Sequence, residues 1–415
     1  MTQAISQPIP FPTPTVTDVL TEVLRDGARS MLAQAVEQEV AVYLAERSHL
    51  TDPEGHRQVV RNGYKPSRTV LTGLGPIEVH QPRVRDRRPV DRQEKFTSKL
   101  LPPYLRKTPG VEGVIPWLYL YGISSDDFPA ALSSLLGPSA QGLSASTVTR
   151  LKGAWEQEFK EWNTRSLAGK QYPYVWADGV YFNIRLGEDD RQCILVLMGA
   201  TPEGKKELIA IADGYRESEQ SWSELLLSAK ARGLEIAPKL ATGDGALGFW
   251  AAIDKVWPTT GHQRCWVHKT VNVQNKMPKH LHGKAQSMLH DIWMASTRAD
   301  AHKAFELFIQ TFTAKYPKAV ECLVKDRDKL LAFYDFPAEH WPHLRTTNPI
   351  ESTFATVRLR TDKTKGSGSR TACLTMVFKL AQVAEQHWRA LNGSALVQDV
   401  IACIPYVDGI KTQAA

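Results

Sequence analysis

The chain of 415 residues lacks the features that define several large protein classes. It has no apolar run near the roughly 18 residues that a membrane-spanning helix needs; the longest strongly apolar run extends only from Cys193 to Ala200. Its N-terminal sequence has neither the basic start nor the apolar stretch of a secretory signal. Its five cysteines are an odd number and widely spread, which argues against a disulfide framework. We therefore expect a cytoplasmic protein without membrane segments.

The chain also has little net charge, because 51 Lys and Arg stand against 44 Asp and Glu, a formal charge of +7. The distribution is uneven: segments 57–107, 264–284 and 358–370 carry +9, +5 and +4, which leaves the rest at −11. One basic run is commonly only a solvated surface, but three on an otherwise acidic chain favour neutralisation of phosphate. Nucleic acid is therefore the expected partner.

The N-terminal half divides into three kinds of sequence. Apolar residues recur at helical spacing from Val19 to Leu44, which predicts a packing helix. Residues 51–110 are interrupted by Gly and Pro around short strand-like pieces at Thr69–Leu71 and Ile77–His80, and we expect an extended, basic, weakly structured segment. Two helices are expected next, one opening at Asp126 and one starting at Ser144 or Ser146 and running to Trp162. This pair is typical of a helix-turn-helix, although two helices of an ordinary bundle would give the same pattern.

Residues 173–265 show the most regular alternation of elements. Three strand-like runs separated by short turns are followed by a helix that Ser218 can cap, a short strand at Pro238–Thr242, a second helix and a last strand. The order βββαβαβ is that of an RNase H-like core. From Cys265 the predicted elements are helical, which predicts an all-α insertion before the core resumes.

Two aspartates occupy positions in this core where metal-dependent phosphodiester cleavage needs carboxylates. Asp178 lies within the first strand, and Asp244 follows the fourth. Each precedes a glycine, and Asp-Gly is also a common turn, so neither aspartate is specific alone. Asp213 has the same local sequence, but it ends the third strand, away from the expected site.

A third carboxylate is expected on the final helix of the core, where Glu351 follows Asn348 and Pro349. An acid there could also simply stabilise the helix N-terminus. The basic residues Arg358, Arg360, Lys363 and Lys365 follow Glu351 and could hold DNA phosphates.

Several motifs together resemble the Mutator-like family of bacterial insertion-sequence transposases. They are the segments Trp176–Gly179, Gly243–Gly245, Gln263–His268, Thr346–Ser352 and Thr364–Gly366. The resemblance implies an RNase H-like core interrupted by a helical insertion between the second Asp and the Glu. It also implies DDE chemistry at Asp178, Asp244 and Glu351, with two Mg²⁺ ions that Mn²⁺ can replace.

Within these motifs, Cys265 and His268 form a Cys-x-x-His pair directly after the fifth strand. Zinc would need about four ligands, and no second pair stands at conventional spacing. We therefore favour a packing or DNA-contact role near the active site over a zinc site.

These observations lead us to expect a DNA transposase that cleaves the ends of its element and joins the 3′-hydroxyls to target DNA. Its partners would be the terminal inverted repeats and target DNA, bound by a homodimer in the nucleoid. A nuclease or recombinase without strand transfer, and a catalytically idle DNA-binding protein, are the alternatives. The residues expected to contact DNA are Arg83, Arg85, Arg87, Arg88, Thr147, Thr149, Arg150, Lys152 and the four basic residues after Glu351.

The expected domains follow from the same reading. They are an N-terminal helical region (1–56), a basic linker (57–107), a helix-turn-helix domain (108–168), the first part of the core (169–265), the α-helical insertion (266–345), the last part of the core (346–395) and a C-terminal tail (396–415).

Overall fold

The computed structural model describes residues 19–108, 110–111, 145–184, 191–214, 216–351, 354–355 and 369–412. The chain divides into two compact units, residues 1–151 and 152–415, and each is described by itself. The helix expected to open at Asp126 lies outside the described residues. None of the described helices combines the length and apolar character needed to cross a membrane.

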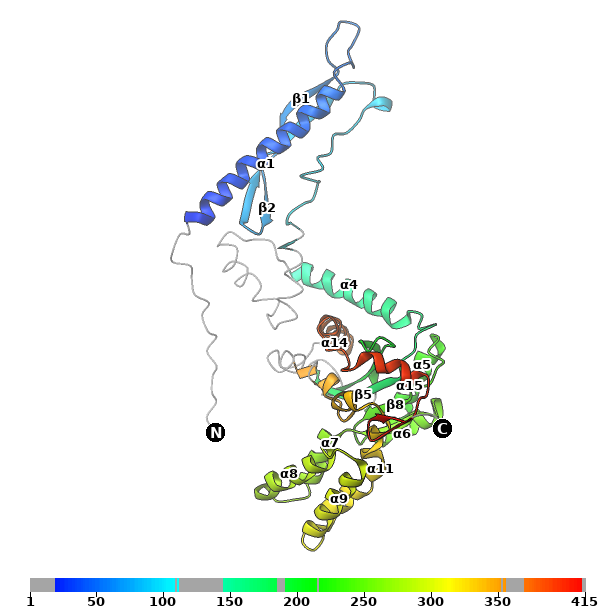
Figure 1. Cartoon of the computed structure of the whole chain (residues 1–415). Coiled ribbons are helices and arrows are strands. Elements are labelled where there is room, and N and C mark those ends of the chain that lie inside the picture. The colour runs from blue at the N-terminus through cyan, green and yellow to red at the C-terminus, as the bar shows by residue number, and fades with distance from the viewer. Residues whose placement is uncertain are drawn as a thin grey trace. The chain divides into compact units, whose positions relative to one another are not determined.

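In the described residues 19–108 of the first unit, the long helix α1 is followed by four short strands (Figure 1). Antiparallel pairing joins β2 to β3 and β1 to β4. The tight turn between β2 and β3 ends at Gly75, whose φ of 99° lies in the left-handed region that favours glycine. The elements are α1 (Val19–Glu46), β1 (Val59–Tyr64), β2 (Arg68–Thr72), β3 (Gly75–Val79), β4 (Pro82–Asp86) and the 3₁₀ turn η1 (Val90–Arg92).

These strands correct our expectation that residues 51–110 are weakly structured. Val36 of α1 is buried together with Val70 of β2, Ile77 and Val79 of β3, and Leu101. Isolated two-stranded ribbons are marginal in water, and packing against a helix supplies the missing apolar burial. The strand-like pieces at Thr69–Leu71 and Ile77–His80 were recognisable, but the helix that stabilises them is some 40 residues away in sequence.

The second unit is built around a five-stranded sheet of order β7-β6-β5-β8-β9. The first three strands pair antiparallel, and β8 and β9 add in parallel on the other side of β5. Ser218 caps α5 by accepting a hydrogen bond from the Ser221 backbone N–H, as expected. The order of strands and helices predicted for residues 173–265 is confirmed. The elements are β5 (Tyr174–Asn183), β6 (Arg191–Ala200), β7 (Lys206–Gly214), α5 (Glu219–Ala231), β8 (Leu240–Gly243), α6 (Leu247–Val256) and β9 (Gly261–Arg264).

Alternation along β5 directs its side chains to two different cores. Val175 and Ala177 share a buried cluster with residues of α5 and α6. Tyr174 and Trp176 instead meet the segment around residues 336–344, where the Tyr174 hydroxyl hydrogen-bonds His340 at 2.8 Å and the Trp176 indole donates to the His343 carbonyl.

Every element between β9 and residue 344 is an α-helix or a 3₁₀ turn, as expected for the helical region. Two separate helices cover residues 282–312, because Thr297 caps a new helix. Lys269 of the helical region and Arg264 of β9 both form ion pairs with Asp326. These ion pairs connect the helical region to the edge strand of the sheet. The elements are α7 (Trp266–Gln274), η2 (Lys279–Leu281), α8 (His282–Trp293), α9 (Arg298–Phe312), α10 (Pro317–Val324), α11 (Arg327–Leu330), η3 (Ala332–Asp335), η4 (Ala338–His340) and α12 (Trp341–Leu344).

Two long helices flank the sheet region. Phe378 of α14 (Arg370–Glu385) contacts Trp162 of α4 (Ala145–Thr164), with ring centroids 4.9 Å apart, and Phe159 at 5.2 Å. α14 ends at Glu385. The chain closes with η5 (Ser394–Leu396), α15 (Val397–Ile401) and the two-residue strands β10 (Tyr406–Val407) and β11 (Ile410–Lys411).

Candidate active site

The parallel pair β5–β8 brings the two predicted aspartates together. Ala177 pairs with Gly243, so Asp178 and Asp244 are the next residues on adjacent strands. Asp178 is only 6% exposed. The Asp244 carboxylate accepts a hydrogen bond from the Ala246 N–H at 2.7 Å, and its carbonyl accepts one from the Trp250 indole, which together hold the turn into α6. Two carboxylates thus lie at the same edge of the sheet.

Glu351 is held by the first turn of a helix whose described residues are 348–351 and 354–355. The fully buried Thr347 precedes it and donates its hydroxyl to the Glu351 carboxylate at 3.0 Å. The Thr347 backbone N–H donates to the Cys265 sulfur at 3.3 Å. His268 lies 3.6 Å from the Glu351 carboxylate through Nε2. The Cys-x-x-His pair is therefore a neighbour of Glu351, in line with the expected place near the active site.

Cys265, His268 and Glu351 are also close enough to offer ligand atoms to one metal ion, since these atoms all lie within 4.8 Å of one another. Sulfur and nitrogen donors suit zinc rather than Mg²⁺. Cys265 is however fully buried and accepts a hydrogen bond from Thr347. The contacts favour a supporting role for the pair, in which Cys265 holds Thr347 and Thr347 holds Glu351.

The electrostatics of His268 connect the aspartates with Glu351. A hydrogen bond with Cys265 and the nearby negative charges of Asp178 and Glu351 raise the pKa of His268 to about 9, against the opposing effect of burial. Such charge interactions act over roughly 10 Å at ordinary ionic strength. His268 therefore contacts Glu351 and lies within the range of the Asp178 charge, and Asp178 is the neighbour of Asp244 on the paired strand.

A fourth acid, Glu217, acts on this region, and its role was not predicted from the sequence. Burial, followed by the negative charges of Asp244 and Asp178, raises the pKa of its carboxyl to about 7. In the sequence Glu217 is an unremarkable acid just before the cap of a helix. Only the contacts of the folded chain distinguish it from the other acids at helix starts.

Asp213, in contrast, is separated from these carboxylates by its place in the sheet. It stands on β7, two strands away from β5, and its carboxylate accepts hydrogen bonds from the Arg370 guanidinium. Asp213 and Asp178 therefore lie on different strands with different partners, although both stand in the sequence Ala-Asp-Gly.

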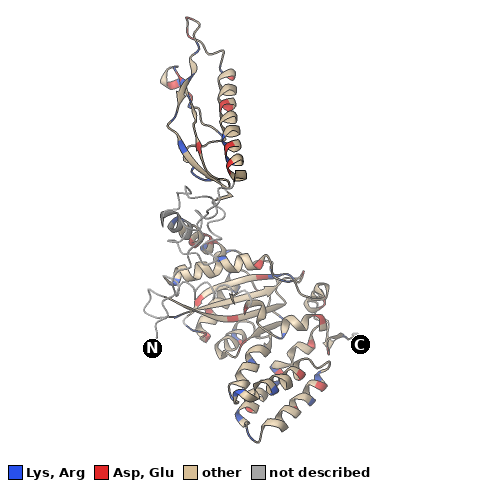
Figure 2. Ribbon diagram, turned by 90° about the vertical axis from the view of Figure 1, so that its left-hand side faces the viewer, with Lys and Arg blue, Asp and Glu red and all other residues tan. Residues whose placement is uncertain are grey.

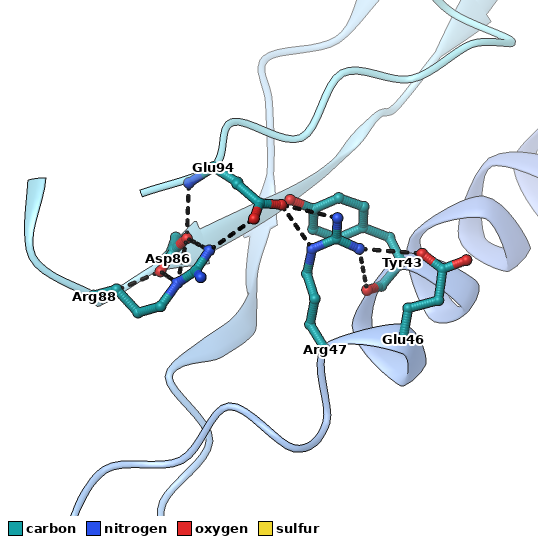
Figure 3. Close-up of polar contacts among 6 residues, drawn as sticks. All are labelled: Tyr43, Glu46, Arg47, Asp86, Arg88 and Glu94. Carbon is teal, nitrogen blue, oxygen red and sulfur yellow. Dashed lines mark hydrogen bonds and ion pairs between the residues drawn. The ribbon is translucent and has the colours of Figure 1, made fainter. Parts of the chain in front are cut away.

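The predicted DNA contacts are only partly described. Arg83, Arg85 and Arg87 are exposed and alternate along β4 and its exit, so their side chains share a face. Arg88 is different: its guanidinium donates to Asp86 at 2.7 Å and lies 3.4 Å from Glu94 (Figure 3). The hydrogen bonds from Arg88 hold the pKa of Asp86 far below its usual range. Arg88 therefore serves first to hold this segment together.

In the described residues of the first unit, α1 carries more acidic than basic residues and the strands carry more basic than acidic ones (Figure 2). Glu37 of α1, for example, accepts from Arg61 at 2.7 Å and from Tyr64 at 2.6 Å. Part of the positive charge of segment 57–107 is thus neutralised within the fold. Of the remaining predicted contacts, Arg150 is exposed on α4. Arg358, Arg360, Lys363, Lys365 and the side chains of Thr147, Thr149 and Lys152 lie outside the described part of the chain.

A groove of about 590 Å³ borders Glu351 in the second unit. Its lining combines cationic and aromatic side chains, which suit phosphates and bases. The lining residues are Lys206, Pro342, His343, Asn348, Pro349, Glu351, His387, Trp388 and Arg389.

Comparison with known proteins identifies the family. The model of the Mutator family of transposases matches residues 11–390. The chain is 52% identical to the transposase for insertion sequence element IST2 of Acidithiobacillus ferrooxidans, over 68% of this chain and 94% of that protein. It is also 52% identical to the transposase for IS6120 of Mycolicibacterium smegmatis, over 68% of this chain and 87% of that protein.

One solved structure, the Drosophila P element transposase strand transfer complex, matches 70% of this chain and 85% of its own at 8% identity. Its TM-score of 0.27 is too low to support an argument about this fold. The sequence matches alone are decisive, and the chain belongs to the Mutator family of transposases.

Proposed function

We propose that this transposase cleaves the ends of its insertion sequence and joins the 3′-hydroxyls to target DNA, with Asp178, Asp244 and Glu351 as its catalytic carboxylates. The observation that carries the proposal is the adjacency of Asp178 and Asp244 on paired parallel strands, with Glu351 beside His268. A sheet of three antiparallel strands extended by two parallel ones also fits an RNase H-like core, which places its carboxylates at this edge.

The three side chains fit divalent cations by their chemistry. Carboxylate oxygens are the ligands that Mg²⁺ prefers, and Mg²⁺ keeps much of its water, so few protein ligands suffice. Asp178 and Asp244 would hold the ions from adjacent strands, with Glu351 completing the set. Two bound Mg²⁺ or Mn²⁺ ions would supply activation of the attacking oxygen and stabilisation of the leaving one.

The contribution of the chain itself is to position these carboxylates and the DNA. Thr347 and His268 orient Glu351, since a hydrogen bond and a nearby positive charge both restrict its carboxylate. The groove beside Glu351 would hold a DNA strand through the exposed Arg389, while the buried Lys206 donates to the Arg389 carbonyl. Arg83, Arg85 and Arg87 would add phosphate contacts from the first unit, and a homodimer would hold two terminal repeats together.

The test compares two aspartates that share the sequence Ala-Asp-Gly. Purified wild-type protein, Asp178→Asn and Asp213→Asn are incubated with labelled terminal-repeat DNA and Mg²⁺. We expect Asp178→Asn to abolish cleavage and Asp213→Asn to retain it, because Asp213 pairs with Arg370 instead. Equal activity of the Asp178→Asn variant and wild type would refute the assignment.

A second assay supplies a pre-cut 3′ end and target DNA. Joined product supports transposition, and cleavage without joining would indicate a nuclease or recombinase. A wild-type protein that binds the terminal repeats but neither cuts nor joins them would be a catalytically idle DNA-binding protein.

A further inference from the structure

Glu217 occupies the turn between β7 and α5, directly before the capping residue Ser218. We propose that Glu217 is a fourth carboxylate of the active site and binds a divalent cation together with Asp178 and Asp244. This inference rests on the proposed function, because it adds a ligand to the same metal site.

The position of the Glu217 carboxyl follows from its contact with Gly179. A Cβ built on Gly179 would lie 2.4 Å from Cδ of Glu217 and 2.6 Å from its Oε1. The carboxyl group therefore rests against the backbone of Gly179, the residue that follows Asp178 on β5. A side chain at position 179 would clash with the Glu217 carboxyl. Glycine is therefore required after Asp178 for packing, although no turn is formed there.

The backbone of Glu217 is held from the other side by α6. A Cβ on Gly248, in the first turn of α6, would lie only 2.4 Å from the Glu217 carbonyl oxygen. Gly248 follows Asp244 by four residues and is carried by the same turn into α6. Glu217 thus lies between β5, which carries Asp178, and the first turn of α6, which follows Asp244 by a short turn.

The charges that act on Glu217 are mostly negative. In the described part of the chain, Asp244 and Asp178 both raise the pKa of its carboxyl, while the His268 charge and a hydrogen bond with Tyr181 lower it. Within the described residues no Lys or Arg forms an ion pair with Glu217. Carboxylates that gather at low exposure repel one another unless a proton or a cation offsets their charge. The divalent cations of the proposed reaction are suited to this role.

The alternative is a structural role, in which Glu217 keeps a proton and only anchors the turn through Tyr181. The two roles predict different metal affinities for a variant. Substituting a metal ligand weakens metal binding, whereas substituting a purely structural acid leaves the metal affinity unchanged. Glu217→Gln keeps the size of the side chain and its contact with Gly179, so it separates metal binding from packing.

The experiment measures binding of Mn²⁺ alone to metal-free full-length protein by isothermal titration calorimetry, with the melting temperature followed in parallel. Four proteins are compared: wild type, Glu217→Gln, Asp178→Asn and Glu224→Gln. Glu224 is an exposed acid on α5 whose partner is Gln220, so Glu224→Gln is the matched control for the loss of one negative charge.

We expect Glu217→Gln to bind Mn²⁺ at least about tenfold more weakly than wild type and to lose much of the metal-induced rise in melting temperature. Without metal it should melt no lower than wild type, because a repulsive charge is removed. Glu224→Gln should bind as wild type does.

Wild-type Mn²⁺ affinity in Glu217→Gln, together with loss of affinity in Asp178→Asn, would overturn this inference and leave the proposed function standing. A wild-type protein that binds no Mn²⁺, or an Asp178→Asn variant that binds as well as wild type, would overturn both. Should Glu217→Gln fail to fold, Glu217→Asp gives the same reading, since a carboxyl drawn back by one methylene should also weaken Mn²⁺ binding.

Discussion

Replacing Gly248 by alanine should destabilise the second unit, although alanine is ordinarily the better helix residue. In a helix interior this change gains about 1 kcal/mol. Here the new Cβ would lie 2.4 Å from the Glu217 carbonyl oxygen and 2.6 Å from the Glu219 backbone nitrogen. These are main-chain atoms and cannot rotate aside, so the turn before α5 must move.

The expected magnitude follows from the balance of these two effects. Overpacking typically costs about 1–3 kcal/mol, and a clash with main chain belongs at the upper end. After the helix-propensity gain, the net loss should be about 1–2 kcal/mol. For a unit of this size that corresponds to a fall in melting temperature of roughly 2–8 °C.

The assay is thermal denaturation followed by circular dichroism, with Gly153→Ala as the matched control. Gly153 is an exposed glycine within α4, and a Cβ added there would have no neighbouring atom within 4 Å. The Gly153→Ala variant should therefore be as stable as wild type or slightly more stable. If Gly248→Ala also melts at or above the wild-type temperature, the close packing of α6 on the Glu217 turn is refuted.

Three further predictions concern residues that hold the site and its supports. Thr347→Val should lower cleavage by about tenfold or more while the melting temperature falls little, because Glu351 loses an orienting hydrogen bond; an unchanged cleavage rate would contradict this. Phe378→Ala should cost about 3–5 kcal/mol by opening a cavity between α14 and α4, measured by denaturant unfolding, whereas a loss below 1 kcal/mol would show that this contact is loose. Burial, followed by the Lys206 charge, lowers the pKa of His343 from 6.5 to about 4, so the unfolded chain binds a proton there that the folded chain does not. Stability should therefore fall as the pH drops from 6.5 to 4, and His343→Gln should flatten that dependence in melting curves recorded across this range.

The sequence predicted those parts of the structure that depend on neighbouring residues. The alternating runs of β5 and β6, the cap at Ser218 and the start of a helix near Glu351 all follow from a few adjacent positions. The positions of Asp178 and Asp244 could be anticipated from the strand order, since an RNase H-like core pairs its first strand with its fourth and so places the two aspartates on neighbouring strands. Local propensity and strand order were sufficient for these elements.

The sequence did not predict the order in segment 57–107, where strands form because α1 covers them. Nor did it distinguish Arg88, which pairs with Asp86 and Glu94, from Arg83 and Arg85, which stay exposed. A run of basic residues looks uniform in sequence, because the partners that neutralise some of them are chosen by folding.

By itself, then, the sequence determined the strand and helix order of residues 173–265 and the three acids proposed for catalysis. Tertiary structure alone decided that Thr347 links Cys265 to Glu351, and that Glu217 lies against Gly179. The physical reason is range. Hydrogen-bonded turns and alternating burial are encoded within a few residues, whereas the charge and contacts around a carboxylate come from segments that only packing of the folded chain brings together.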